Sequence, residues 1–210
     1  MLGLPSKTEL NKRIEKKIIY SLFNMDNKQK EAFDADISLL YIVNEISEYS
    51  TGISSGDNVS TIHLVRVVMK KKEYSDANIT RLFKLINNKI LLVLEYKDEI
   101  QVVANHLKLF KTDWTPKDDF VLELYGLNLD RVYENFITQI GGFQIENENT
   151  LDEQIVNDER KAKLEKEIAR LEKMARNEKQ PKKKFELVQQ INKLSKVKGA
   201  ERCGDKCRNQ

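Results

Sequence analysis

The chain has 210 residues, of which 40% are hydrophobic and 33% are charged, and its formal net charge is +3. It is too apolar for a chain that is disordered throughout, and no apolar run approaches the roughly 18 to 20 residues that a membrane-spanning helix needs. No basic segment followed by an apolar one opens the chain, so we expect no secretory signal and a cytoplasmic protein. Because both cysteines, Cys203 and Cys207, fall in the last eight residues, the core should fold without disulfides.

The charge is divided unevenly along the chain. From Leu151 onward there are 17 basic and 11 acidic residues, a balance of +6, whereas the preceding residues carry 19 basic and 22 acidic residues, a balance of −3. An acidic body therefore carries a basic arm, and contact with a polyanion should favour the arm.

The N-terminal segment predicts two helices and then a strand. Ser6 and Glu9 have the spacing of a capping box, and an apolar stripe at every fourth residue follows, which predicts a helix over about residues 7–23. A polar segment over residues 27–34 predicts a short helix, and β-branched residues between 37 and 46 predict the first strand. The stripe consists of Leu10, Ile14, Ile18 and Leu22.

Residues 49–58, which are rich in serine and contain Gly52 and Gly56, predict a loop. Closely spaced glycines also occur in phosphate-binding loops. This segment lacks the Gly-Lys-Ser/Thr ending, however, and it runs into a strand rather than a helix. We therefore interpret it as a connecting loop.

The centre of the predicted sheet is a strand over residues 89–96. Its five consecutive apolar residues, Ile90 to Leu94, leave no polar face, which is typical of a strand covered on both sides. A strand over residues 60–69 and a helix from about Ser75 precede it, a unit that favours a right-handed parallel crossover. The segments after it predict an antiparallel strand over residues 100–109, a short strand over 120–125, and a helix over 127–140 that ends at Gly141 and Gly142.

The segment after Thr150 predicts a helical hairpin. Apolar residues at three-to-four spacing alternate with charged ones, which is typical of a narrow coiled-coil seam. Because Pro181 interrupts the seam, two antiparallel helices joined near residues 178–182 are favoured over one long kinked helix that dimerises in trans. Sparse seams are marginally stable, so the hairpin should need a partner surface. The expected partner-binding residues are Leu164, Ile168, Leu171, Val188, Ile191 and Leu194.

Together these elements predict an α+β protein. Residues 1–149 should form a globular domain, built on a mixed, mainly antiparallel sheet of about five strands with helices packed on it. A basic, coiled-coil-like antiparallel helical hairpin over residues 150–198 and a disordered tail over residues 199–210 should follow.

Four features occur together in this chain: Leu4-Pro5 with Thr8, a basic predicted helix after them, an apolar predicted strand before the turn near Lys97, and the charge-rich sequences of residues 164–173 and 177–187. In this combination the chain resembles a bacterial family catalogued as domain of unknown function 4391, over nearly its whole length. Members of that family tend to be encoded beside helicase-like and DNA methyltransferase genes of restriction-type defence islands. The resemblance therefore implies a DNA-processing neighbourhood, and it supplies no active-site residues.

Glu95 and Lys97, at the end of the central strand, have the Glu-x-Lys form of a metal-dependent nuclease half-motif. In such a site the two side chains and a second acid on a neighbouring strand hold a divalent ion and an attacking water. Asp57 and Glu45 are candidates for the second acid. However, a helix separates the second and third predicted strands, where nuclease cores usually have a hairpin. Glu-x-Lys also arises often by chance in a charge-rich chain, so a solvated pair at the end of the strand is the favoured interpretation.

The histidines and cysteines do not form a recognisable metal site. His63 and His106 lie on predicted strands among apolar residues, which favours core or surface histidines over a catalytic dyad or a zinc site. Cys203 and Cys207 lack a second pair of ligands. We therefore expect neither a metal nor a cofactor.

The strongest polyanion-facing feature is a basic cluster at the tip of the hairpin. Neutralisation of phosphates there would give salt-dependent, sequence-independent binding, and since only one aromatic residue interrupts the cluster, base stacking is not indicated. The alternative, which the residues alone favour, is a solvated tip that keeps the hairpin soluble. The cluster consists of Arg176, Lys179, Lys182, Lys183 and Lys184.

We therefore expect a non-enzymatic accessory subunit of a restriction-type or phage-defence assembly, whose hairpin docks a helicase-like or DNA methyltransferase partner. A non-specific DNA contact at the hairpin tip is a further expectation, and no membrane contact is expected. Two alternatives remain open: a metal-dependent nuclease that uses Glu95 and Lys97, and a scaffold that self-assembles through the hairpin.

Overall fold

The computed structural model describes the chain except residues 1, 147–148 and 205–210, and for residues 197–204 it describes the backbone alone. The chain divides into two compact units, Met1–Gln144 and Ile145–Gln210. No helix in the described ranges is long and apolar enough to cross a membrane.

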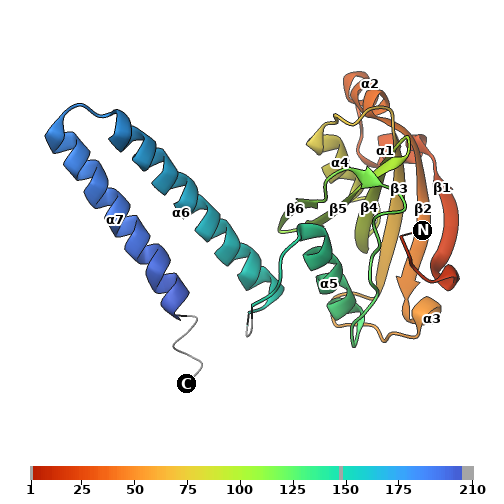
Figure 1. The fold of residues 1–210 in the computed structure, drawn as a ribbon. Helices are drawn as coiled ribbons and strands as arrows, with labels where there is room; N and C mark the ends of the chain where they lie inside the picture. Colours follow the sequence, from red (N-terminus) through yellow and green to blue (C-terminus); the bar gives the residue numbers. More distant parts are fainter. Residues whose placement is uncertain (1, 147–148, 205–210) are drawn as a thin grey trace. The chain divides into compact units, whose positions relative to one another are not determined.

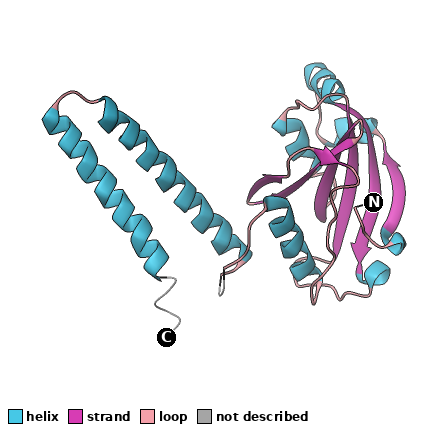
Figure 2. Cartoon of the chain, viewed as in Figure 1, coloured by secondary structure: helices cyan, strands magenta, loops and turns pink. Residues whose placement is uncertain are grey.

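Unit 1 contains a seven-stranded mixed sheet (Figures 1 and 2). Six strands follow one another in chain order across the sheet, and β7 pairs with β5; β3 and β4 are parallel, whereas the other pairs are antiparallel. The predicted α+β class and mainly antiparallel sheet are confirmed, with more strands than the expected five. The strands are β1 (Glu9–Ile14), β2 (Ile37–Ser47), β3 (Thr61–Met69), β4 (Lys89–Tyr96), β5 (Glu99–His106), β6 (Lys108–Lys111) and β7 (Thr115–Pro116).

Six helical segments of unit 1 surround the sheet or connect its strands. In α2 the Asp26 and Gln29 side chains form a capping box, and α5 ends at Gly142, whose left-handed conformation is the one expected of a glycine that stops a helix. The segments are η1 (Ser6–Thr8), α1 (Lys16–Leu22), α2 (Asn27–Asp36), α3 (Glu48–Thr51), α4 (Asp76–Leu82) and α5 (Leu129–Gly141).

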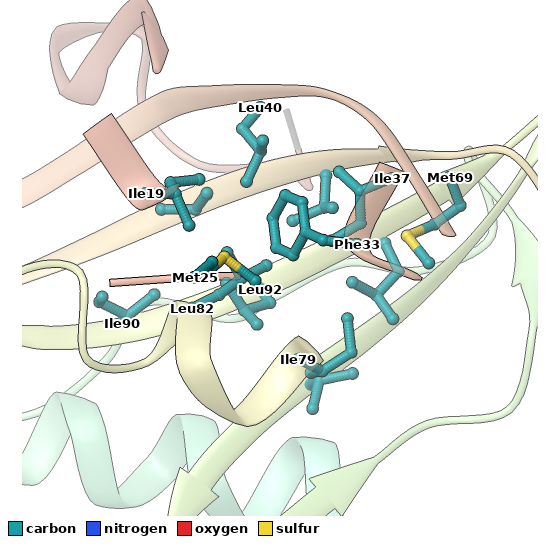
Figure 3. Packing of buried hydrophobic residues seen from close by; sticks show 14 residues of the cluster. Ile19, Met25, Phe33, Ile37, Leu40, Met69, Ile79, Leu82, Ile90 and Leu92 are labelled. Atoms are coloured by element: carbon teal, nitrogen blue, oxygen red, sulfur yellow. The ribbon is translucent and has the colours of Figure 1, made fainter. Parts of the chain in front are cut away.

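The central strand β4 is covered on both faces, as its apolar run predicts. On one face Leu92 packs in a cluster with Phe33 from α2 and Ile79 from α4 (Figure 3). Leu91 and Val93 point to the opposite face, because side chains alternate along a strand, and they are also fully buried. The helix α5 packs against β3, β5 and β6.

The first half of the helix predicted over residues 7–23 is wrong. Residues 9–14 form β1, which pairs with β2 at the edge of the sheet, and α1 covers only Lys16–Leu22. Positions four residues apart share one face of a strand as well as one face of a helix, so the spacing did not separate the two structures. In α1 the buried residue is Ile19, whereas Ile18 and Leu22 are exposed.

The strand predicted over residues 120–125 is also wrong, since this segment has no regular structure. The predicted strand over residues 100–109 is interrupted at Leu107, whose φ is 56°, and its continuation forms β6. In the segment 120–125, the backbone N–H of Leu122 donates to the carbonyl of Leu2 and not to a strand of the sheet.

Unit 2 is a helical hairpin of α6 (Leu151–Asn177) and α7 (Pro181–Gly204), which are in contact and run in opposite directions (Figure 1). Thr150 and Glu153 form a capping box at the start of α6, and Pro181 begins α7, where a missing N–H costs nothing. The hairpin prediction is confirmed. The backbone of α7 continues to Gly204, into the tail expected to be disordered; residues 205–210 of that tail lie outside the described residues.

The hairpin seam is displaced by one residue on α7. On α6, Leu171 is buried and Leu164 and Ile168 are half-buried, as expected. On α7, Ile191 and Leu194 are half-buried together with Leu187, whereas Val188 is exposed. Leu187 stands four residues before Ile191, so it keeps the helical spacing and takes the place that the prediction assigned to Val188.

Candidate functional site

Glu95 lies near the end of β4 at the centre of a cluster of charged side chains. Its Oε1 is 2.8 Å from the Lys117 Nζ, and its Oε2 is 3.7 Å from the Arg66 Nη1. Glu95 stands opposite Val68 on β3, so Arg66, two residues earlier, points to the same face of the sheet. Two cations therefore share one carboxylate that is only 16% exposed, and this cluster carries a net charge of +1.

Lys97 does not contribute the amine that contacts Glu95. It lies in the turn between β4 and β5 with a φ of 55°, and its Nζ is 5.3 Å from the centre of the Tyr96 ring. The strand ends at Tyr96, so the alternation that would place residues 95 and 97 on one face is lost. Lys117 takes this place because β7, the strand just before it, pairs with the start of β5. β7 has only two residues, so the sequence carries no periodic signal for it.

The acids proposed as partners of Glu95 lie in other surroundings. Glu45 lies beside His63, with 3.3 Å between the Glu45 Oε2 and the His63 Nε2, and the backbone N–H of Asp57 donates to Asp130. Among the described residues no group of three or more His, Cys, Asp or Glu side chains is arranged to hold a metal ion. The geometry places Glu95 in ion pairs, and the nuclease hypothesis stays a prediction.

The two histidines occupy separate environments. His63 is buried on β3 beside Glu45, whereas the ring of His106, at the end of β5, lies 6.0 Å from the ring of Tyr133. Cys207 and the side chain of Cys203 lie outside the described residues.

The serine- and glycine-rich loop before β3 binds a carboxylate of the protein itself. The Asp130 side chain, in the first turn of α5, accepts hydrogen bonds from the backbone N–H groups of Asp57 at 2.9 Å and Asn58 at 3.1 Å. A Cβ on Gly56 would lie 2.3 Å from the Asp130 Cγ, so the carboxylate fits only against a glycine. The backbone donors that a phosphate would need are therefore already used, which agrees with a connecting loop.

Replacement of Asp130 by alanine should destabilise unit 1 by about 1 kcal/mol, because two backbone N–H groups lose a charged acceptor at an exposed site. The measurement is urea-induced unfolding of the full chain. Asp57→Ala is the matched control. It removes a carboxylate from the same loop but keeps the backbone N–H of residue 57, which donates to Asp130. Equal loss in both variants would contradict this role of the Asp130 carboxylate.

The basic cluster at the hairpin tip is solvent-exposed. Arg176, in the last turn of α6, has a side chain that is 79% exposed, and its Nη2 lies 3.5 Å from the Glu172 Oε2. The other members, Lys179, Lys182, Lys183 and Lys184, are exposed as well. Lys182 to Lys184 occupy the first turn of α7, which contains no acidic residue. The structure thus brings all five predicted residues to one end of the hairpin.

Exposed apolar side chains accompany this cluster. Met174 is 46% exposed near the end of α6, and Phe185 and Val188 are 63% and 39% exposed near the start of α7. Because the spacing of the apolar residues predicts Val188 in the hairpin seam, the sequence did not indicate this exposed apolar group. We call Met174, Phe185 and Val188 the apolar tip residues.

The model of a family described as Domain of unknown function (DUF4391) matches residues 2–197 of the chain. No curated protein and no solved structure matches it.

Proposed function

We propose that this chain, which belongs to the family described as Domain of unknown function (DUF4391), is a non-enzymatic accessory subunit of a DNA-processing assembly of the restriction or phage-defence type. Its hairpin docks a helicase-like or DNA methyltransferase subunit, and the basic tip contacts phosphates of the DNA backbone. The observation that carries the proposal is the combination, at one end of the hairpin, of exposed lysines and exposed apolar side chains.

The placement of the lysines supports a phosphate contact. From Glu172 to Glu186, both included, there are six lysine and arginine residues and three glutamates. The first turn of a helix favours negative side chains, because the free backbone N–H groups there carry partial positive charge. Three lysines in the first turn of α7 therefore weaken the helix start, and the same N–H groups add to their attraction for an anion.

The apolar tip residues support a protein contact. An exposed phenylalanine and an exposed methionine gain free energy when a partner removes them from water, and both residue types are enriched at protein interfaces. Phe185 and Val188 are exposed on α7, whereas Leu187, Ile191 and Leu194 are half-buried. The partner class follows from the resemblance to a family encoded beside helicase-like and methyltransferase genes.

When the full chain is purified from its native host, a helicase-like or DNA methyltransferase subunit should co-purify with it. In a Phe185→Ser/Val188→Ser double variant the recovery of that subunit should fall at least about tenfold, because hot-spot side chains contribute about 2 kcal/mol or more to an interface. The measurement is quantitative mass spectrometry of the proteins that elute with each variant.

Leu127→Ser is the matched control, because Leu127 is an apolar residue of unit 1 that is 92% exposed. This variant should retain the partner. Full recovery of the partner by the Phe185/Val188 variant would refute docking through the apolar tip residues. If no such subunit elutes and light scattering shows a dimer that the double variant loses, the self-assembling scaffold replaces this proposal.

A further inference from the structure

We propose that unit 1 binds a small zwitterionic molecule of the α-amino acid class in a pocket beside Glu95. The pocket has a volume of about 410 Å³ and lies among β1, β2, β3, the end of β4 and the segment after β7. This inference concerns unit 1 alone and does not depend on the function proposed for the hairpin.

Two neighbouring strands are irregular where they line the pocket. The pairing of β1 with β2 changes register between Glu9 and Lys12, and Asn11 within this interval has a φ of 49°. The pairing of β2 with β3 changes register between Ile42 and Asn44, so that one extra residue bulges from β2. Bulges re-aim side chains and are common beside functional sites.

The bulge in β2 determines the position of Asn44. Ile42 stands opposite Val65 and Asn44 opposite Leu64, so the extra residue turns Asn44 to the face that also presents Arg66 and Glu95. Without the bulge, Asn44 would point to the opposite face. The irregularity therefore adds an amide to the charged cluster, and all three residues line the pocket.

A further left-handed backbone conformation occurs near the N-terminus, at Leu2. Leu2 lines the pocket with a φ of 54°, a left-handed conformation that is rare for a bulky residue and costs on the order of 1 kcal/mol or more. Its side chain is 6% exposed. Packing thus holds a strained backbone against this pocket.

The amide of Asn44 is fully buried and only half satisfied. Its Nδ2 donates to the Thr8 Oγ1 at 2.7 Å, and the Thr8 hydroxyl donates to the carbonyl of Pro5 at 2.7 Å, so the orientation of the amide follows from the network. The Asn44 Oδ1 has no hydrogen-bond partner among the described residues. A buried acceptor without a donor costs about 1–3 kcal/mol, which an N–H donor of a ligand would remove.

Arg66 offers the complementary group. Its guanidinium lies over the ring of Tyr41, 4.8 Å from the ring centre, and its Nε has no hydrogen-bond partner in the described part of the chain. Arg66 and Lys117 together carry two positive charges against the single charge of Glu95. One additional negative group, such as a carboxylate, would balance this cluster.

The remaining charges of the pocket distinguish a zwitterion from a simple anion. Asp118 also lines it, and its carboxylate would repel a ligand that is only negative. An ammonium group is attracted to the Asp118 carboxylate and can donate to Asn44, while the carboxylate of the same ligand pairs with Arg66 and Lys117. An α-amino acid carries both groups on one carbon, and several members of this class fit the volume.

The test is a titration of the ¹⁵N-labelled full chain, followed by the backbone amide signals of Asn44 and Arg66. Each of the twenty amino acids is added singly, with acetate and methylammonium as probes that carry one charged group each. At least one amino acid should give saturable shifts, whereas acetate and methylammonium should give none. Absence of saturation with every amino acid, or equal affinity for acetate, would overturn the proposal.

Two variants connect the signal to the pocket. Lys117→Met removes one of the two cations, and Arg66→Lys keeps the charge but removes the Nε donor; each should weaken binding at least tenfold. Lys111→Met is the matched control, because Lys111 is a similarly exposed lysine that pairs with Asp76 outside the pocket, and it should bind as the wild type does. Unchanged binding by Lys117→Met would refute the site, and the amide spectrum itself shows whether each variant is folded.

Discussion

Replacement of Lys182, Lys183 and Lys184 by glutamine should lower the affinity of the full chain for duplex DNA by about two orders of magnitude near 0.1 M salt. Each lysine that neutralises a phosphate releases about 0.9 of a condensed counterion, so the loss of three contacts should reduce the slope of log Kobs against log salt by about 2.7. All three side chains are exposed in the first turn of α7, where they can reach a duplex together. Fluorescence anisotropy over a range of salt concentrations measures both quantities.

The matched control changes the same number of charges on the same unit. Lys161, Lys163 and Lys166 lie along α6, away from the tip, and the first two are paired with Glu146 and Glu159. Their replacement by glutamine should change the salt slope by less than about 1, because paired lysines release few counterions. Equal effects of the two triple variants would assign the binding to net charge. An absence of binding by the wild type would favour the solvated tip.

Replacement of Asp36 by alanine should destabilise unit 1 by about 3 kcal/mol. Asp36 lies at the end of α2 with only 4% of its surface exposed, and its Oδ2 accepts from the backbone N–H of Ser75 at 3.0 Å and the Asn78 Nδ2 at 2.9 Å. Loss of the carboxylate removes the acceptor of the Ser75 N–H and leaves the buried Asn78 Nδ2 with only its longer hydrogen bond to the Ala32 carbonyl, at 3.3 Å. The Lys71 ammonium, 3.0 Å away, is half exposed and adds little, because water screens it.

Asp36 should also contribute to the loss of stability in acid. Burial by itself would raise the pKa of Asp36, but the hydrogen bonds from Ser75, Lys71 and Asn78 outweigh it and hold the pKa below the ordinary value of 3.8. A carboxyl with a lower pKa in the folded state stabilises the fold above its unfolded pKa. This stabilisation is lost as the pH falls through the lower folded value.

Urea-induced unfolding between pH 2.5 and about pH 7 measures both expectations, since an ordinary aspartate has a pKa near 4. Asp36→Asn should show a flatter decline of stability in acid than the wild type. Asp119→Ala, which removes an exposed carboxylate of the same unit, should follow the wild-type curve. A loss of less than about 1 kcal/mol in Asp36→Ala would show that the three donors find other acceptors.

Several local features of the sequence were sufficient to predict the main elements. The uninterrupted apolar run of β4 predicted a strand covered on both faces, and both of its faces are buried. Pro181 marked the break between the two helices of the hairpin, and α7 begins at this residue. Each of these signals acts within a few residues of itself, so its effect does not depend on the rest of the fold.

The candidate sites required the tertiary structure. The hairpin tip was predicted because its lysines are close in the chain, but the exposure of Val188 depends on which of two possible seams α7 presents to α6. The pairing of Glu95 with Lys117 instead of Lys97 depends on the contact between β7 and β5. The residues that pair in this contact are more than ten positions apart in the sequence.

The same limit explains the N-terminal strand and the pocket. Residues 9–14 have a spacing that suits a helix and a strand equally, and the open edge of β2 decided between them by offering backbone hydrogen bonds. The bulge that turns Asn44 toward Arg66 exists only in the register between β2 and β3. The sequence by itself therefore determined the elements whose signals are local. Only the tertiary structure decided which side chains meet, because strand register and edge pairing are set by segments that are distant in the chain.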